Sequence, residues 1–188
     1  MINENQIFVV VDIENDGPAV GLNSMLSLAA VATTPQKEIA RFYRKLQPLQ
    51  DAKRDPDTTS WWNKHPEAWQ EVNTDAEPAS KVIIDFYNWV MELGLEPIFV
   101  SNPIGLDYTF VSWYLFQFAP DNPFIGEKND IRTLDIRSYV AGKFNFTYDN
   151  SSRLKWPTWL IEDMPKHTHK AIDDAAGYAF ILRKIIKK

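Results

Sequence analysis

The chain has 188 residues, of which 45% are hydrophobic and 13% aromatic, so it can form a substantial core and is not a disordered chain. It contains no cysteine, which excludes a disulfide scaffold and thiolate metal sites. A net charge of −5 argues against a protein that coats long nucleic acids. An enzyme that grips a few nucleotides is still allowed, because acids gathered at a metal site also make a chain acidic.

The first residues, MINENQIFVV, carry no basic group before their short apolar run, which argues against a signal peptide. No apolar stretch reaches membrane-spanning length. We therefore expect a cytoplasmic protein without a membrane partner, and a single domain over residues 1–188. Glycine-rich loops of the dinucleotide-binding and P-loop types do not occur in the sequence.

The first half of the chain predicts three strands followed by helices. Residues 6–13 are apolar on both faces and predict a central strand. Residues 24–33 and 38–47 predict two further strands, and the short links favour an antiparallel meander. Residues 61–72 predict short helices, and residues 77–94 predict a long helix that ends at its glycine.

The second half alternates strands and helices. Residues 96–101 predict a short buried strand, and residues 105–119 predict a helix rich in aromatic side chains. Residues 130–142 predict a strand that runs into a helix, and residues 144–168 predict mostly loop. Residues 169–188 predict a closing helix with a basic C-terminal end. This order indicates an α/β fold with a mixed sheet.

Two carboxylates fall on one face near the end of the first predicted strand. Asp12 and Glu14 are two positions apart, and residues i and i+2 of a strand point the same way. Carboxylates held so close repel each other, and a hard cation such as Mg²⁺ or Mn²⁺ between them removes the repulsion. Taken alone, however, such a pair is more often two solvated acids beyond the end of a strand.

Two later motifs could complete a metal site. Asp107 lies near the start of a helix that follows a buried strand, where α/β sites gather, although acids near helix starts are common as caps. His169 precedes Asp174 by five positions at the start of the last helix. His167 and His169 with hard carboxylates make a poor structural zinc set. We interpret His65 as a surface or packing residue.

Together these motifs resemble those of the DEDDh 3′–5′ exonucleases. Asp12-x-Glu14, then Asp107, then His169 with Asp174, match the three motifs of this superfamily in order and in their expected elements. The superfamily includes the proofreading subunit of bacterial replicative DNA polymerase, ribonuclease T and oligoribonuclease. Residues 58–69 also look like a smaller branch of exoribonuclease-like members.

The resemblance implies a ribonuclease H-like fold, with a five-stranded mixed sheet flanked by helices. It implies two Mg²⁺ or Mn²⁺ ions held by Asp12, Glu14, Asp107 and Asp174, with His169 as the general base. The expected reaction removes nucleoside 5′-monophosphates from the 3′ end of single-stranded RNA or DNA, with RNA slightly favoured. The residues expected to contact this substrate are Leu22, Met25, Asn102, Phe110 and Trp61. Relatives are often dimers, so a homodimer is a further expectation.

One departure and two alternatives stay open. Many relatives have Thr or Ser after the glutamate, whereas this chain has Asn15 and Asp16. Asp16 either points away from the site or limits the choice of substrate. A non-catalytic nucleic-acid or protein binding module on the same fold is one alternative function. The other is a metal-dependent phosphoesterase that acts on small nucleotides.

Overall fold

A five-stranded mixed sheet forms the centre of the protein, whose computed structural model describes residues 3–187. The first three strands form the predicted antiparallel meander, and the last two run parallel to the first. The strand order is β3-β2-β1-β4-β5. The strands are β1 (Gln6–Asn15), β2 (Met25–Thr33), β3 (Glu38–Lys45), β4 (Glu96–Ser101) and β5 (Thr133–Asp135). The expectation of a five-stranded mixed sheet is confirmed.

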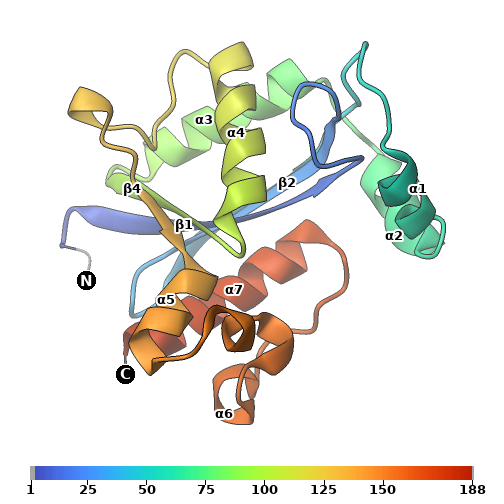
Figure 1. Ribbon diagram of the computed structural model, residues 1–188. Helices are drawn as coiled ribbons and strands as arrows, with labels where there is room; N and C mark the ends of the chain where they lie inside the picture. Colours follow the sequence, from blue (N-terminus) through green and yellow to red (C-terminus); the bar gives the residue numbers. More distant parts are fainter. Residues whose placement is uncertain (1–2, 188) are drawn as a thin grey trace.

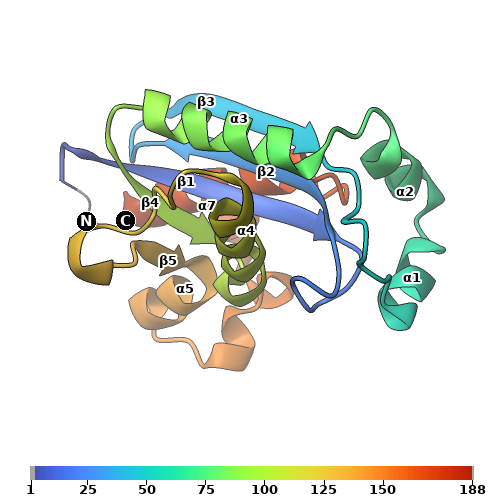
Figure 2. The same ribbon diagram turned by 90° about the horizontal axis from the view of Figure 1, so that it is seen from above.

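Helices cover both faces of the sheet. Figure 1 shows α3 (Ala79–Glu92) and α4 (Ile104–Phe118) on one face. The other face carries α5 (Ile136–Phe144), α6 (Thr158–Ile161) and α7 (Ala171–Ile186). In the view from above, α1 (Pro56–Trp62) and α2 (Pro66–Asn73) lie beyond the end of β1 and β2 (Figure 2). Among residues 3–187, no helix combines the length and the apolar character that crossing a membrane requires.

The central strand β1 divides its side chains between two cores. Val9, Val11 and Ile13 pack in the core beneath α3 and α4, whereas Phe8 and Val10 pack in the core beneath α7. Because side chains alternate along a strand, Asp12 and Glu14 continue the second series. The strand register therefore directs both carboxylates toward the face that α7 covers.

The segment 144–168, predicted to be mostly loop, also contains three short helical turns. Trp156 is buried against the α7 core, and its indole Nε1–H donates a hydrogen bond to the Ser151 carbonyl at 2.7 Å. This bond and the burial of Leu160 hold the segment against the rest of the protein. Its prolines and polar residues had suggested an irregular loop. Its helical turns are η2 (Tyr148–Ser151), η3 (Arg153–Lys155) and α6. One further turn, η1 (Glu127–Asn129), precedes β5. The last residue of the predicted closing helix, residue 188, lies outside the described residues.

The loop from β1 to β2 closes tightly around one glycine. A Cβ atom on Gly17 would lie 2.4 Å from Cγ of Asn23. Asn23 is held in place, because its Oδ1 accepts from the Ala19 amide at 2.9 Å and its Nδ2 donates to the Lys53 carbonyl at 2.6 Å. The sequence at this point therefore requires a residue without a side chain.

We expect Gly17→Ala to lower the free energy of unfolding by about 1–3 kcal/mol, the usual effect of overpacking. Thermal unfolding checks this, with Gly142→Ala as the control because no atom lies within 4 Å of a Cβ at that position. Equal melting temperatures for Gly17→Ala and the unchanged protein would contradict the packing described here.

Candidate active site

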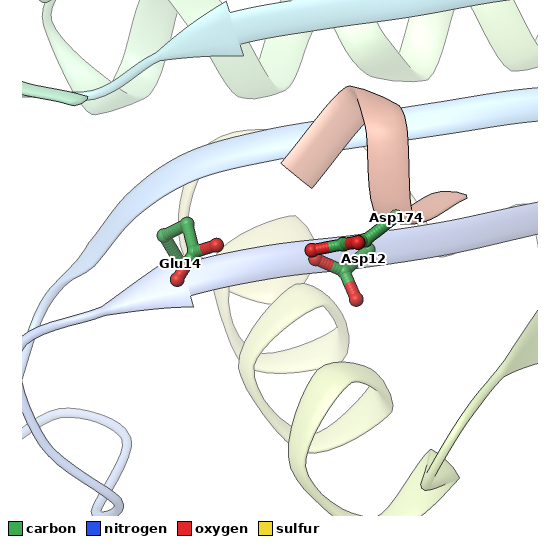
Figure 3. A group of neighbouring side chains, drawn as sticks. All are labelled: Asp12, Glu14 and Asp174. Atoms are coloured by element: carbon green, nitrogen blue, oxygen red, sulfur yellow. The ribbon is translucent and has the colours of Figure 1, made fainter. Parts of the chain in front are cut away.

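Three carboxylates meet at the end of β1. Asp12 and Glu14 come from the strand, and Asp174 comes from the first turn of α7. One oxygen of each lies within 4.8 Å of the others. Figure 3 shows Asp12 and Asp174 side by side, with Glu14 further along the strand. Oxygen ligands at this spacing suit a hard divalent cation.

The fourth predicted acid lies beside this group. β1 and β4 are parallel, so their carboxyl ends meet at the same edge of the sheet. The chain leaves β4 there and enters α4, whose first turn carries Asp107. Asp107 is 5% exposed, receives a hydrogen bond from the backbone of Ile13, and its charge acts on Asp12. It is not one of the three acids whose oxygens are mutually within 4.8 Å.

The acids disfavour one another's ionisation. Burial raises the pKa of Asp12 well above its ordinary value, and the charges of Asp107, Glu14 and Asp174 raise it further. Burial, with the charges of Asp174 and Asp107, raises the pKa of Glu14 to about 8. Burial raises the pKa of Asp107 to about 7. A protein folds around such a group only if protons or cations compensate the negative charge.

This arrangement predicts an unusual dependence of stability on pH. The pKa values of Asp12, Glu14 and Asp107 are higher in the folded protein than in the unfolded chain, so the folded state binds protons more tightly. The stability that results is fully present below the unfolded pKa values near 4. It is lost as pH rises through about 7 to 8. We expect the melting temperature without divalent cations to fall between about pH 6 and pH 9, and the rise caused by added Mg²⁺ to grow over that range. Calorimetry with and without EDTA measures both. A metal-free melting temperature that rises with pH would contradict the raised pKa values.

The three histidines of the chain lie together, and two of them, His167 and His169, interact with Asp174. The His169 ring lies 5.0 Å from that of Trp61, 4.8 Å from that of His65 and 4.3 Å from that of His167. Nδ1 of His167 makes the direct contact with the Asp174 carboxylate. Burial and the two neighbouring imidazoles lower the pKa of His169, which favours its neutral form at pH 7. His65, interpreted from the sequence as a surface or packing residue, is thus a neighbour of His169.

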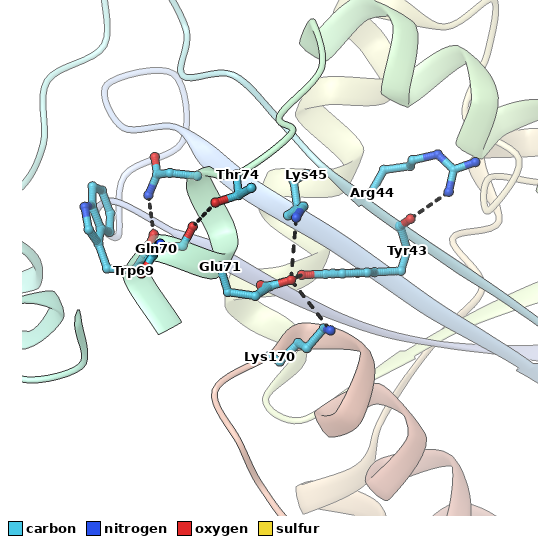
Figure 4. A network of polar contacts seen from close by, with 9 residues as sticks. Tyr43, Arg44, Lys45, Trp69, Gln70, Glu71, Thr74 and Lys170 are labelled. Atoms are coloured by element: carbon cyan, nitrogen blue, oxygen red, sulfur yellow. Dashed lines mark hydrogen bonds and ion pairs between the residues drawn. The ribbon is translucent and has the colours of Figure 1, made fainter. Parts of the chain in front are cut away.

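The α1–α2 unit is held in this position by a polar network centred on Glu71 (Figure 4). The Tyr43 hydroxyl donates a hydrogen bond to Glu71 at 2.8 Å. The ammonium groups of Lys45 and Lys170 lie 3.7 and 3.6 Å from the same carboxylate. Since Tyr43 belongs to β3 and Lys170 precedes α7, the network joins α2 to an edge strand and to the loop that carries His169.

The predicted substrate contacts divide into exposed and buried residues. Leu22 is 72% exposed in the β1–β2 loop, and Trp61 and Asn102 are half-buried. Met25 and Phe110 are fully buried in the core under α3 and α4, so the prediction that they touch a nucleotide is not supported. β2 is covered on both faces, and α4 turns Phe110 toward the sheet.

Asp16 is engaged inside the β1–β2 loop. It is 2% exposed, and its carboxylate accepts a hydrogen bond from the Ser24 amide at 2.5 Å. Its own amide donates to the Ser24 carbonyl at 3.0 Å. The residue that departs from the commoner family pattern therefore closes a loop. Of the two readings offered by the sequence, this burial favours a side chain directed away from the substrate.

The sequence reasoning missed two residues beside the acids, Arg153 and Tyr178. The charge of Arg153 acts on Asp12, and Tyr178 interacts with Asn102 and Arg153. Tyr178 lies one turn after Asp174, so the helical period offered a signal. Arg153 lies in a segment without periodicity, where no local pattern places it.

A model of the exonuclease family RNase_T matches residues 9–182. The chain belongs to this exonuclease family. It is a metal-dependent 3′–5′ exonuclease of the DEDDh superfamily, whose motifs the sequence resembles.

The known proteins that resemble this chain include other exonucleases. The 3′-5′ DNA exonuclease Cap18 of Escherichia coli is 27% identical over 193 residues, which cover 100% of this chain and 95% of Cap18. The nuclease domain of 3′hExo, a DEDDh family member bound to rAMP, has a TM-score of 0.67 at 13% identity and covers 97% of this chain and 91% of that one. E. coli exonuclease I in complex with a dA16 oligonucleotide has a TM-score of 0.69 at 16% identity, over 97% of this chain and 41% of that one. The two structures support the shared fold.

Proposed function

We propose that this exonuclease, as one domain over residues 1–188, removes nucleoside 5′-monophosphates from the 3′ end of single-stranded DNA. The observation that carries this proposal is the group of Asp12, Glu14 and Asp174, in which one oxygen of each lies within 4.8 Å of the others. Asp107, with its raised pKa, adds a fourth carboxylate beside Asp12. Four acids beside one another are better explained by bound cations than by packing.

The donor set fits two Mg²⁺ or Mn²⁺ ions, since it consists of carboxylates whose charges raise the pKa values of Asp12 and Glu14. Bound ions of this kind supply an activated water and compensate charge on the leaving 3′ oxygen. Asp12, the acid on which the charges of all three others act, takes the central position among the ligands. Asp107 and Asp174 would supply further ligands from α4 and α7.

His169 is proposed as the general base. Its lowered pKa leaves the imidazole neutral near pH 7, so a ring nitrogen can accept a proton. Trp61 and His65 pack against its ring and limit its rotation. His167 is not proposed as the base, because its Nδ1 contacts the Asp174 carboxylate.

The substrate class is the point at which the comparisons change the proposal. The sequence slightly favoured RNA, whereas Cap18, similar over the whole of this chain, is described as a DNA exonuclease. We therefore place DNA first and RNA second. Leu22, Trp61 and Asn102 are the proposed substrate contacts, because each has exposed surface beside a motif. The cytoplasmic location and the homodimer expected from the sequence remain part of the proposal.

A degradation assay tests the function. Single-stranded DNA and RNA oligomers labelled at the 5′ end are incubated with the pure protein and Mg²⁺ or Mn²⁺. We expect a ladder of single-nucleotide steps from the 3′ end, faster on DNA and abolished by EDTA. Binding without cleavage would favour the binding module. Hydrolysis of small phosphodiesters such as bis-p-nitrophenyl phosphate, with both oligomers intact, would favour the phosphoesterase.

A further inference from the structure

The segment between α5 and α7 brings a cation to the acids. Arg153 begins η3 and is half-buried. Its charge acts on Asp12 and on His169, and it interacts with Tyr178 one turn after Asp174. Arg153 is thus near enough to Asp12 and His169 for its charge to act on both. In this position a guanidinium is close enough to influence both the central acid and the proposed base.

The backbone that carries Arg153 is fixed from both sides. Trp156 is 4% exposed, and its indole donates to the Ser151 carbonyl. The Ser151 hydroxyl in turn donates to the Tyr148 carbonyl at 2.6 Å. These bonds hold η2 and η3 together as one short unit. The guanidinium is therefore carried by a hydrogen-bonded part of the backbone.

Arg153 is also available for a ligand. Across residues 3–187 the ion pairs within 4 Å include none that involves Arg153. Lys45 and Lys170, two lysines of the neighbouring polar network, are both paired with Glu71. Among the described residues, Arg153 acts on Asp12 and forms no ion pair with a carboxylate, whereas Lys45 and Lys170 both do.

A cavity of about 340 Å³ adjoins Arg153. His167, which contacts Asp174, forms another part of its wall, so the cavity lies beside the acids. Leu154, 92% exposed, offers an apolar surface at the same place. A cationic group, an imidazole and an apolar side chain around one cavity are a combination that suits a nucleotide.

The charge balance of the loaded site calls for one more cation. Four carboxylates carry four negative charges, and two divalent ions neutralise them. The phosphodiester then adds one negative charge that no ion compensates. We propose that the Arg153 guanidinium binds the non-bridging oxygens of the scissile phosphodiester, and that the adjoining cavity receives the terminal nucleotide. This inference rests on the proposed exonuclease function. A planar guanidinium suits it, because its N–H groups can bind two phosphate oxygens at once.

Three variants test the proposal. Arg153→Met keeps the aliphatic stem, Arg153→Lys keeps the charge, and Lys155→Met removes a neighbouring cation on the same turn. We expect Arg153→Met to lower kcat/KM on a single-stranded oligomer on the order of a hundredfold. Arg153→Lys should recover part of this loss, and Lys155→Met should stay within about twofold, as surface changes usually do.

A second measurement does not need turnover. Isothermal titration with dAMP, the expected product of a DNA substrate, reports phosphate binding directly. We expect the affinity of Arg153→Met for dAMP to be lower by about tenfold or more, since a hydrogen bond to a charged group is lost. The rise in melting temperature caused by Mg²⁺ should be unchanged, because Arg153 is not a metal ligand. If Arg153→Met does not fold, Arg153→Lys carries the comparison, with weaker dAMP binding expected.

Wild-type kcat/KM and wild-type dAMP affinity in Arg153→Met would overturn the proposal. So would a loss of activity with unchanged dAMP affinity and no recovery in Arg153→Lys, because that pattern indicates a purely structural role. If the unchanged protein degrades no oligomer, the proposed exonuclease function fails instead. The dAMP titration then still decides whether Arg153 binds a nucleotide phosphate.

Discussion

Asp174→Asn is expected to reduce the release of nucleoside 5′-monophosphates on the order of a thousandfold. The asparagine keeps the shape of the side chain, but it replaces one oxygen and removes the charge from a group that is 3% exposed and lies among Asp12 and Glu14. Loss of a ligand charge weakens cation binding and the stabilisation that the cations give the transition state. The rate of monophosphate release and the rise in melting temperature with Mn²⁺ should both collapse.

Asp173→Asn is the matched control for this change. Asp173 neighbours Asp174 in the first turn of α7, but its carboxylate accepts a hydrogen bond from the Thr168 hydroxyl at 2.7 Å instead of joining the acids. We expect its activity to stay within a few-fold of the unchanged protein, as for exposed positions in general. Asp174→Asn activity above about a tenth of the normal rate would remove Asp174 from the proposed metal site.

His169→Ala is expected to lower the rate on the order of a hundredfold, which is the usual contribution of a general base. The rise in melting temperature with Mn²⁺ should remain, because the four acids are intact. The measurement is kcat on a single-stranded oligomer from about pH 6 to pH 9. In the unchanged protein the rate should fall as His169 gains a proton at low pH, at a value below its ordinary pKa.

His167→Ala decides between the two histidines that precede α7. His167 contacts Asp174, so its removal should alter the surroundings of one ligand without removing the base. We expect a smaller loss than for His169→Ala. A larger loss in His167→Ala, with His169→Ala near the normal rate, would move the base to His167. Such a result would mean that the five-residue spacing to Asp174 had indicated the wrong ring.

The fold was largely predictable because its strongest signals are local. The β1 segment is apolar at both odd and even positions, which is typical of a central strand, and that strand is covered on both faces. The period of two placed Asp12 and Glu14 on one side, and β1 delivers them to the face of α7. The helical pattern after His169 likewise predicted the element that carries Asp174.

What sequence reasoning missed depends on contacts between distant segments. His65 and His169 are about a hundred positions apart, and only the packing of the α1–α2 unit brings their rings to 4.8 Å. Arg153 approaches Asp12 from a segment with no periodic pattern. The errors at Met25 and Phe110 have a related cause. Proximity to a motif suggested contact with the substrate, but both side chains point into the core.

Asp12 and Glu14 share one strand, which pairs with β2 at both positions, whereas its pairing with β4 ends at Val10. Their separation is therefore set by the pleat of a backbone that cannot stretch without breaking ladders. Asp107 and Asp174 come from α4 and α7, and packed helices slide as units more easily than a paired strand stretches. When an ion of one radius replaces another, we therefore expect the distance between Asp12 and Glu14 to stay constant. The acids on α4 and α7 should move instead.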